Sequence, residues 1–167
     1  MAHPVVLALF PNASAVIEVA EQLHRLGVSR EQLSVVARTA NEERDLAERM
    51  DGTPGVELED SRPAAIFGEI GGQMLAAIAL VMPGIGPIVA AGPLAAELGE
   101  VAGHAAGSLV SVLTSAGLER DRAEMLQGEL NQGSILLGVH TVQATLDDVV
   151  NCLSRAGGTQ IQTVTWK

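Results

Sequence analysis

Four polar side chains interrupt a long apolar block, and they are the strongest candidates for chemistry in this chain. Glu100 and His104 are four residues apart, so a helix would place both on one face. Glu69 and Glu97 are the other two. Carboxylate and imidazole groups together suit iron, manganese or zinc. If helices of two copies joined in a four-helix bundle, Glu69, Glu100 and His104 could converge on one metal ion.

The spacing of this set leaves a second interpretation open. Ferritin-like metal sites use Glu-x-x-His, whereas here three residues separate Glu100 from His104. The same residues could instead form an i,i+4 pair or a solvent-facing strip on an otherwise apolar helix. No nucleophile-elbow motif presents a serine. The pair Gly84 and Gly86 lacks the strand before it and the third glycine of a dinucleotide fingerprint. The sequence therefore supplies no catalytic residue and predicts a protein that is not an enzyme.

The elements that would position these residues lie in a block without cations. Between Arg62 and Arg120 no Lys or Arg occurs, and small residues recur there at every fourth position. On helices, each series forms a ridge that permits close approach of a second helix. The predicted interface between copies comprises Gly68, Gly72, Ala76, Ala95, Gly99, Gly103, Gly107 and Ser111.

A turn divides this block into two predicted helices. Pro83, Gly84, Gly86 and Pro87 cannot continue a helix and form a hinge between antiparallel segments. The helices would cover about 64–81 and about 93–115. Together they predict a glycine-rich antiparallel helical hairpin that drives homodimer or higher assembly.

The flanking segments have the patterns of an ordinary mixed α and β protein. The first part predicts a strand at 5–10, a helix at 13–26 with Asn12 as its N-cap, and a strand parallel to the first at 33–37. A charged helix at 41–50 and an acidic linker at 56–63 follow. The last part predicts a helix at 119–131, a strand at 134–140, a helix at 146–156 and a strand at 161–166.

Two or three strands alone make a marginal sheet, so the flanks are expected to form one domain. The predicted fold class is α+β: a ferredoxin-like β-α-β/α-β-α-β sandwich that carries the inserted helical hairpin. One discontinuous domain would cover 1–60 and 117–167, and the insertion would cover 61–116.

Charge and composition exclude some classes of partner. The formal net charge is −10, and the one lysine is Lys167. Nucleic-acid binding needs clustered cations, so we expect no nucleic-acid partner. Cys152 stands alone and is predicted to be a small buried hydrophobe. The N-terminus lacks the pattern of a signal peptide, which predicts a cytoplasmic protein.

Membrane association is the alternative for the apolar block. In the hairpin at 64–115, the first segment, Ala64 to Met82, is close to the length needed to span a membrane. Arg62, Arg120 and Arg122 flank the base of the hairpin, as the positive-inside rule requires. Glu97, Glu100 and His104 lie well inside the second helix, where charges are costly in lipid. The net charge of −10 disfavours attraction to anionic lipid head groups, so any contact with a membrane would have to be hydrophobic.

Three stretches resemble the bacterial general stress protein and heat-induced stress protein family. They are 82–96, with the sequence MPGIGPIVAAGPLAA; 117–120, GLER; and 133–139, GSILLGV. The similarity extends from Val5 to Gly157. It implies an association with stress and no established enzymatic activity, and it supplies no catalytic residues to transfer. Glu69, Glu97, Glu100 and His104 depart from the Gly, Ala or Leu expected there.

Three hypotheses for function follow from the sequence. The leading hypothesis is a non-enzymatic bacterial stress-type protein that self-associates through its glycine-zipper hairpin and needs no cofactor. The second is a membrane-associated protein that inserts the 64–115 hairpin. The third is a metal-binding bundle that holds iron, manganese or zinc between two copies.

Overall fold

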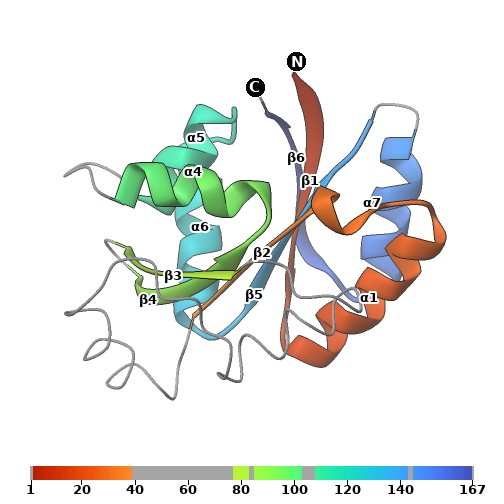
Figure 1. Ribbon diagram of the computed structural model, residues 1–167, viewed down its shortest axis with the longest axis horizontal. Coiled ribbons are helices and arrows are strands. Elements are labelled where there is room, and N and C mark those ends of the chain that lie inside the picture. The colour runs from red at the N-terminus through yellow and green to blue at the C-terminus, as the bar shows by residue number, and fades with distance from the viewer. Residues whose placement is uncertain (1, 39–76, 83–84, 103–107, 143–144, 167) are drawn as a thin grey trace.

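The computed structural model describes residues 2–38, 77–82, 85–102, 108–142 and 145–166. Figure 1 shows helices on both sides of a twisted sheet. In chain order the elements are β1 (His3–Phe10), α1 (Ala13–Arg25), a 3₁₀ turn (Arg30–Gln32), β2 (Leu33–Arg38), β3 (Ala77–Met82), β4 (Gly86–Ala91), α4 (Pro93–Ala102), α5 (Leu109–Ser115), α6 (Arg120–Asn131), β5 (Ile135–His140), α7 (Leu146–Arg155) and β6 (Thr159–Trp166). The described part is therefore mixed helix and antiparallel sheet, the α+β class that the sequence predicts.

The described strands form one sheet in the order β3-β4-β2-β5-β1-β6, and each neighbouring pair is antiparallel. β5 lies between β1 and β2 and runs opposite to both, so β1 and β2 are parallel to each other, as expected. β1 in turn lies between β5 and β6. The two units β1-α1-β2 and β5-α7-β6 are thus interleaved.

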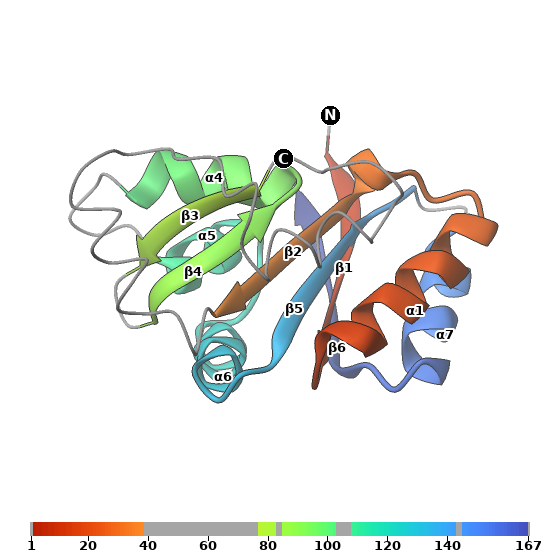
Figure 2. The same cartoon turned by 60° about the horizontal axis from the view of Figure 1, so that its bottom comes forward.

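The central strands are buried on both faces because helices cover both faces. Val6, Ala8 and Phe10 of β1 pack with α1 and α7, whereas Val5, Leu7 and Leu9 pack with α4, α5 and α6. Since side chains alternate along a strand, β1 supplies both cores, and none of these six residues exceeds 1% exposure. Figure 2 shows α1 and α7 on one side of the sheet and α4, α5 and α6 on the other.

The first β-α-β unit follows its local signals. The Asn12 side chain accepts a hydrogen bond from the backbone N–H of Ala15 at 2.9 Å and caps α1. Val16, Val19, Ala20 and Leu23 form the buried face of α1. The chain leaves this helix through Gly27, whose φ of +88° favours glycine. The predicted helix at 41–50 and the linker at 56–63 lie outside the described residues.

The prediction of the first hairpin helix, about 64–81, is wrong over its last residues. Ala77–Met82 is strand β3, and Gly86–Ala91 is strand β4. The prediction failed because a short apolar run between turn residues fits a buried strand as well as a buried helix. Here pairing of β4 with β2 decides the outcome, because it gives β2 a second neighbour. Residues 64–76 lie outside the described part.

The predicted hinge is a connection between strands instead of helices. β3 ends at Met82 and β4 begins at Gly86 and Pro87, while Pro83 and Gly84 lie outside the described residues. Pro87 precedes the residues of β4 that pair with β2, a position where its missing N–H costs little. A strand does precede the Gly84 and Gly86 pair, but strand β4 follows it, so the dinucleotide fingerprint is still not met.

The second predicted helix is present as α4 and α5, and residues 103–107 between them lie outside the described part. Gly92 connects β4 to α4 with a φ of +86°. A Cβ atom at this position would overlap the carbonyl oxygen of Leu33 and lie 2.8 Å from Cα of Ser34. Only glycine therefore allows α4 to begin this close to β2.

The last four elements match the sequence-based expectations to within two residues. Ala123, Leu126 and Leu130 form the buried face of α6, as predicted. α5, which begins with the Ser108–Ser111 capping box, and α6 belong to the same buried cluster as α4 and β1. Residues 77–82, 85–102 and 108–116 thus share the sheet and core of the flanking segments.

Candidate functional site

Three polar side chains that are distant in sequence meet at one end of the sheet. His3 is on β1, Ser34 is on β2 and His140 ends β5. Nε2 of His3 is 2.9 Å from Nδ1 of His140, and Nε2 of His140 is 2.9 Å from Oγ of Ser34. Because β5 lies between β1 and β2, His140 is the middle member of this cluster.

The cluster also holds the first turn of α4. The backbone N–H of Leu94 donates a hydrogen bond to Oγ of Ser34 at 3.0 Å. A helix leaves its first N–H groups without partners, so Ser34 satisfies one of them from a neighbouring strand. Gly92 makes this contact feasible, since it lets the start of α4 approach Leu33 and Ser34.

Aromatic and backbone contacts fix the His140 ring. The indole ring of Trp166 meets it edge-on, with ring centroids 5.5 Å apart. Trp166 is also the β6 residue that pairs with His3 on β1. The Gln32 side-chain amide donates to the His140 carbonyl oxygen at 2.8 Å, and the N–H of Thr141 donates to the Pro4 carbonyl oxygen at 3.0 Å.

Burial disfavours a charge on His140. Its side chain is 6% exposed, and its pKa falls from 6.5 to about 4. Loss of hydration is the larger cause, and repulsion from His3 is the second. At neutral pH the His140 ring is therefore uncharged, and it acts as both a donor and an acceptor of hydrogen bonds.

Serine next to histidine is the pairing of an activated nucleophile, but the location argues for another role. Ser34 is fully buried, at 0% exposure, and its hydroxyl already joins α4 to the sheet. A substrate carbonyl would have to displace α4 to reach Oγ. The cluster is thus built to connect β1, β2, β5 and α4.

The predicted metal ligands do not meet in the described part of the chain. Glu97 is half-buried and Glu100 is exposed, both on α4, while Glu69 and His104 lie outside the described residues. Within the described ranges, no group of three or more His, Cys, Asp or Glu side chains has the arrangement of a metal site.

The predicted interface residues have different environments. Ala95 is 5% exposed and packs in the core beneath α4 together with Leu94 and Leu98, so the side of α4 that faces the sheet includes it. Gly99 is exposed, and Ser111 lies in the capping box of α5. Ala91, which would precede Ala95 in the ridge, is in strand β4. Gly68, Gly72, Ala76, Gly103 and Gly107 lie outside the described part.

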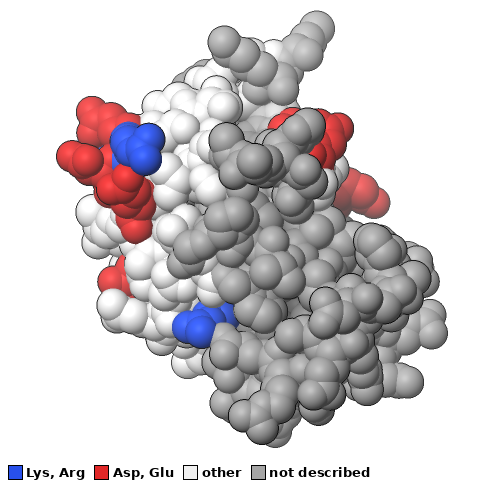
Figure 3. Space-filling model, turned by 90° about the vertical axis from the view of Figure 1, so that its left-hand side faces the viewer, with Lys and Arg blue, Asp and Glu red and all other residues white. Residues whose placement is uncertain are grey.

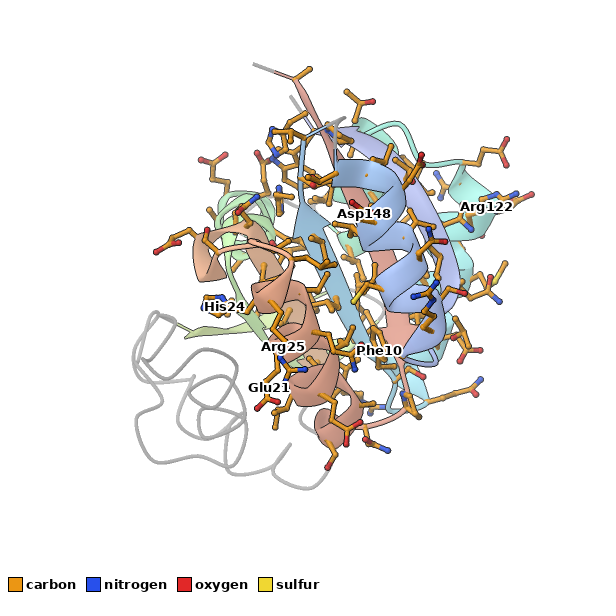
Figure 4. The ribbon with its side chains drawn as sticks, turned by 90° about the vertical axis from the view of Figure 1, so that its right-hand side faces the viewer. Phe10, Glu21, His24, Arg25, Arg122 and Asp148 are labelled. Atoms are coloured by element: carbon orange, nitrogen blue, oxygen red, sulfur yellow. The ribbon has the colours of Figure 1, made fainter. Side chains whose placement is uncertain are left out.

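Cys152 is buried, as predicted, and burial raises the pKa of its thiol. It borders a hollow of about 270 Å³ between α1 and α7. The hollow is lined by Gln22, Leu26, Asp148, Asn151, Cys152 and Arg155. Asp148 on α7 and His24, Glu21 and Arg25 on α1 lie on this side of the molecule (Figure 4). A thiol with a raised pKa is a poor nucleophile, so this hollow has no reactive group from Cys152.

The face of the molecule that carries α4 shows little positive charge. In Figure 3 the described surface is mostly uncharged, and its acidic patches are larger than its basic ones. Two exposed ion pairs join Arg120 to Glu124 and Arg122 to Glu119 along α6. Exposed pairs of this kind contribute about 0–1 kcal/mol to stability, so they mark a solvated helix surface.

Comparisons of the chain with family models, with curated proteins and with solved structures found no match. The likeness to stress proteins accordingly stays an expectation from the sequence. A search of the described helices for one long and apolar enough to cross a membrane found none.

The sequence pointed to the apolar block and missed the histidine cluster. His3 and His140 are 137 positions apart, and Ser34 and His140 are 106 apart. No local spacing rule connects residues at such distances. The one available signal was His140 itself, a titratable residue at the end of an apolar strand.

Proposed function

We propose that this chain is a non-enzymatic bacterial stress-type protein that acts by associating with further copies of itself. The stretches 82–96, 117–120 and 133–139 support the stress-type assignment through their resemblance to that family. The observation that carries the self-association is that β6 is an edge strand among the described strands, where it pairs with β1 alone.

A ferredoxin-like unit is part of this proposal. Its support is the order β2-β5-β1-β6 with α1 and α7 on one face, because two interleaved β-α-β units produce this order. Strands β3 and β4 then extend the sheet beyond β2, and α4, α5 and α6 cover the face that a two-layer sandwich leaves open.

Alternate backbone groups of β6 point away from β1. The N–H of Thr165 donates to the Ala116 carbonyl oxygen at 3.2 Å, so it points away from β1. Outward and inward residues alternate in an antiparallel ladder, and the N–H and C=O of Thr163 therefore point outward as well. A hollow of about 240 Å³ lies beside them, lined by 115–117 and 163–165.

Other features of this edge suit a second copy of the chain. β6 carries no charged residue and no proline, which are two of the devices that prevent edge pairing. The segment 115–117 covers the edge at Thr165, and the β1–β6 register shifts between Leu7 and Leu9, so Thr163 is the position left for a partner strand. Helix α7 contacts both β1 and β6 and so lies over this edge. If two β6 strands paired about a two-fold axis, the two α7 helices would be about 10 Å apart, which is a normal packing distance.

The experiment is the mass of the purified protein by size exclusion with light scattering. Wild type should be a dimer or larger. Thr163→Pro removes the outward N–H and should yield a monomer, whereas Thr163→Val keeps it and should retain the wild-type mass. A monomeric wild type would refute self-association. A Gly99→Leu variant that dissociates while Thr163→Pro does not would move the interface to α4.

A further inference from the structure

When both histidines are neutral and carry their hydrogen on Nδ1, the hydrogen bonds of the His3–His140–Ser34 cluster run in one direction. The Leu94 N–H donates to Oγ of Ser34, so the Ser34 hydroxyl is available to donate to Nε2 of His140. Nδ1–H of His140 then donates to Nε2 of His3. In this arrangement every contact joins one donor to one acceptor, as buried polar groups require.

One additional proton cannot enter this arrangement without breaking it. Only one hydrogen fits between the facing nitrogens of His3 and His140, which are 2.9 Å apart. The extra proton must go to Nε2 of His140, where the Ser34 hydroxyl now donates, or His3 must turn away. In the first case Oγ receives hydrogen bonds from both Leu94 and His140, and the Ser34 hydrogen loses its acceptor in a fully buried place. A buried donor without an acceptor is costly, and the cost is relieved when α4 or the ends of β1 and β6 move away and admit water.

The surroundings make that added charge unfavourable in this location. His140 faces the His3 ring from β1, the Trp166 ring from β6 and the Ser34 hydroxyl from β2. The N-terminus of α4, which carries partial positive charge, lies on the other side of Ser34. The Gln32 amide, which is uncharged, holds the carbonyl of the same residue.

We propose that the cluster is an acid-sensitive latch that holds the start of α4 and the ends of β1 and β6 on the sheet at neutral pH and releases them when His140 takes up a proton. Ser34 couples the two parts, because it is bonded to both Leu94 and His140. The depressed pKa of His140 supports the pH range, which lies between 6.5 and about 4. The device is independent of whether the chain self-associates.

Trp166 provides the readout, since it is the chain's one tryptophan and its ring meets His140 edge-on. Protonated imidazole quenches indole fluorescence. We expect the emission of wild type to fall between pH 6.5 and 4 while circular dichroism shows a folded protein. Over the same range, hydrogen exchange at the Leu94 amide should accelerate relative to that of Leu98, which is deeper in α4.

Variants separate the latch from general acid effects. His3→Gln removes the neighbouring imidazole and offers an acceptor to His140, so the fluorescence midpoint should move to higher pH. His140→Gln should abolish the transition. His24→Gln changes an exposed histidine on α1 and should leave the midpoint unchanged.

Constant Trp166 emission from pH 7.5 to 4 in wild type would overturn the latch. A His3→Gln variant with the wild-type midpoint would overturn it too, and this test stands even if His140→Gln does not fold.

Discussion

His140 is a buried titratable residue whose pKa lies well below its ordinary value. It lies at the junction of β1, β2 and β5. The side chains that hydrogen-bond its ring in the contacts described above are His3 and Ser34, and neither is a carboxylate. A buried neutral histidine stabilises the fold only while it stays neutral. Its contribution to stability therefore depends on pH in a predictable direction.

Acidification should weaken the fold through His140. Its folded pKa of about 4 is below the unfolded 6.5, so between these values the unfolded chain binds more protons and the free energy of unfolding falls as pH falls. By pH 4 this effect amounts to at most about 3 kcal/mol. Urea unfolding at pH 7.5 and pH 5 should show a smaller loss for His140→Gln than for wild type. Equal losses in the two proteins would contradict the assignment.

Gly92 is the glycine at which a side chain should do most harm. Gly92→Ala combines a φ of +86° with overlap of the Leu33 carbonyl, and we expect a loss of more than about 3 kcal/mol. Gly27→Ala has a similar φ of +88° but nothing within 4 Å of the added Cβ, and should lose about 1–2 kcal/mol. Thermal unfolding of both variants measures the difference. Similar losses would show that the backbone can shift at little cost to separate the added Cβ at position 92 from β2.

At the scale of elements, the orientation of α4 shows which of its residues pack against the sheet and which face outward. Leu94, Ala95 and Leu98 face the sheet, so the large residues of this helix do the packing and the small Gly99 remains at the surface. This arrangement differs from a ridge of small residues that packs against another helix. It makes a direct comparison of neighbouring positions informative.

Leu98→Ala should destabilise the protein by about 2–5 kcal/mol, because the side chain is 0% exposed and leaves a cavity between α4 and the sheet. Gly99→Ala, one residue further, should stabilise it by up to about 1 kcal/mol, because alanine is the better helix former at an exposed position. Chemical denaturation of the pair measures both values. If Gly99→Ala were less stable than wild type, the face of α4 that carries Gly99 would be in contact with another part of the protein or with a second copy.

Most elements could be predicted from the sequence because their signals are local. Asn12 caps α1, the spacing of Ala123, Leu126 and Leu130 defines α6, and Gly27 ends a helix. β3 and β4 could not, because the run of Ala, Ile, Leu and Val at 77–82 suits either structure and its pairing partner lies elsewhere in the chain. The histidine cluster has the same character: sheet order alone brings its members together.

At the scale of the molecule, the two cores share one sheet. Both are lined by β1, whose alternate residues point to opposite faces. A loss of one helical layer would expose a face of every central strand to water. The layers are therefore expected to unfold together.

Unfolding of the full chain should be a single transition. Trp166 reports on the end of the sheet near α5, while far-ultraviolet circular dichroism reports on all helices, including α1 and α7 on the other face. We expect the two urea transitions to coincide. Two separated midpoints would mean that 77–116 unfolds as an independent unit.

The position of β1 in the sheet also has a consequence for synthesis of the chain on the ribosome. β1 is made long before both of its partners in the sheet, because β5 and β6 begin only at residues 135 and 159. At ordinary elongation rates its six apolar residues wait on the order of ten seconds for a neighbour. Throughout that interval β1 is an exposed segment of high β propensity. We therefore expect the growing chain to depend on chaperones that bind at the ribosome and shield β1.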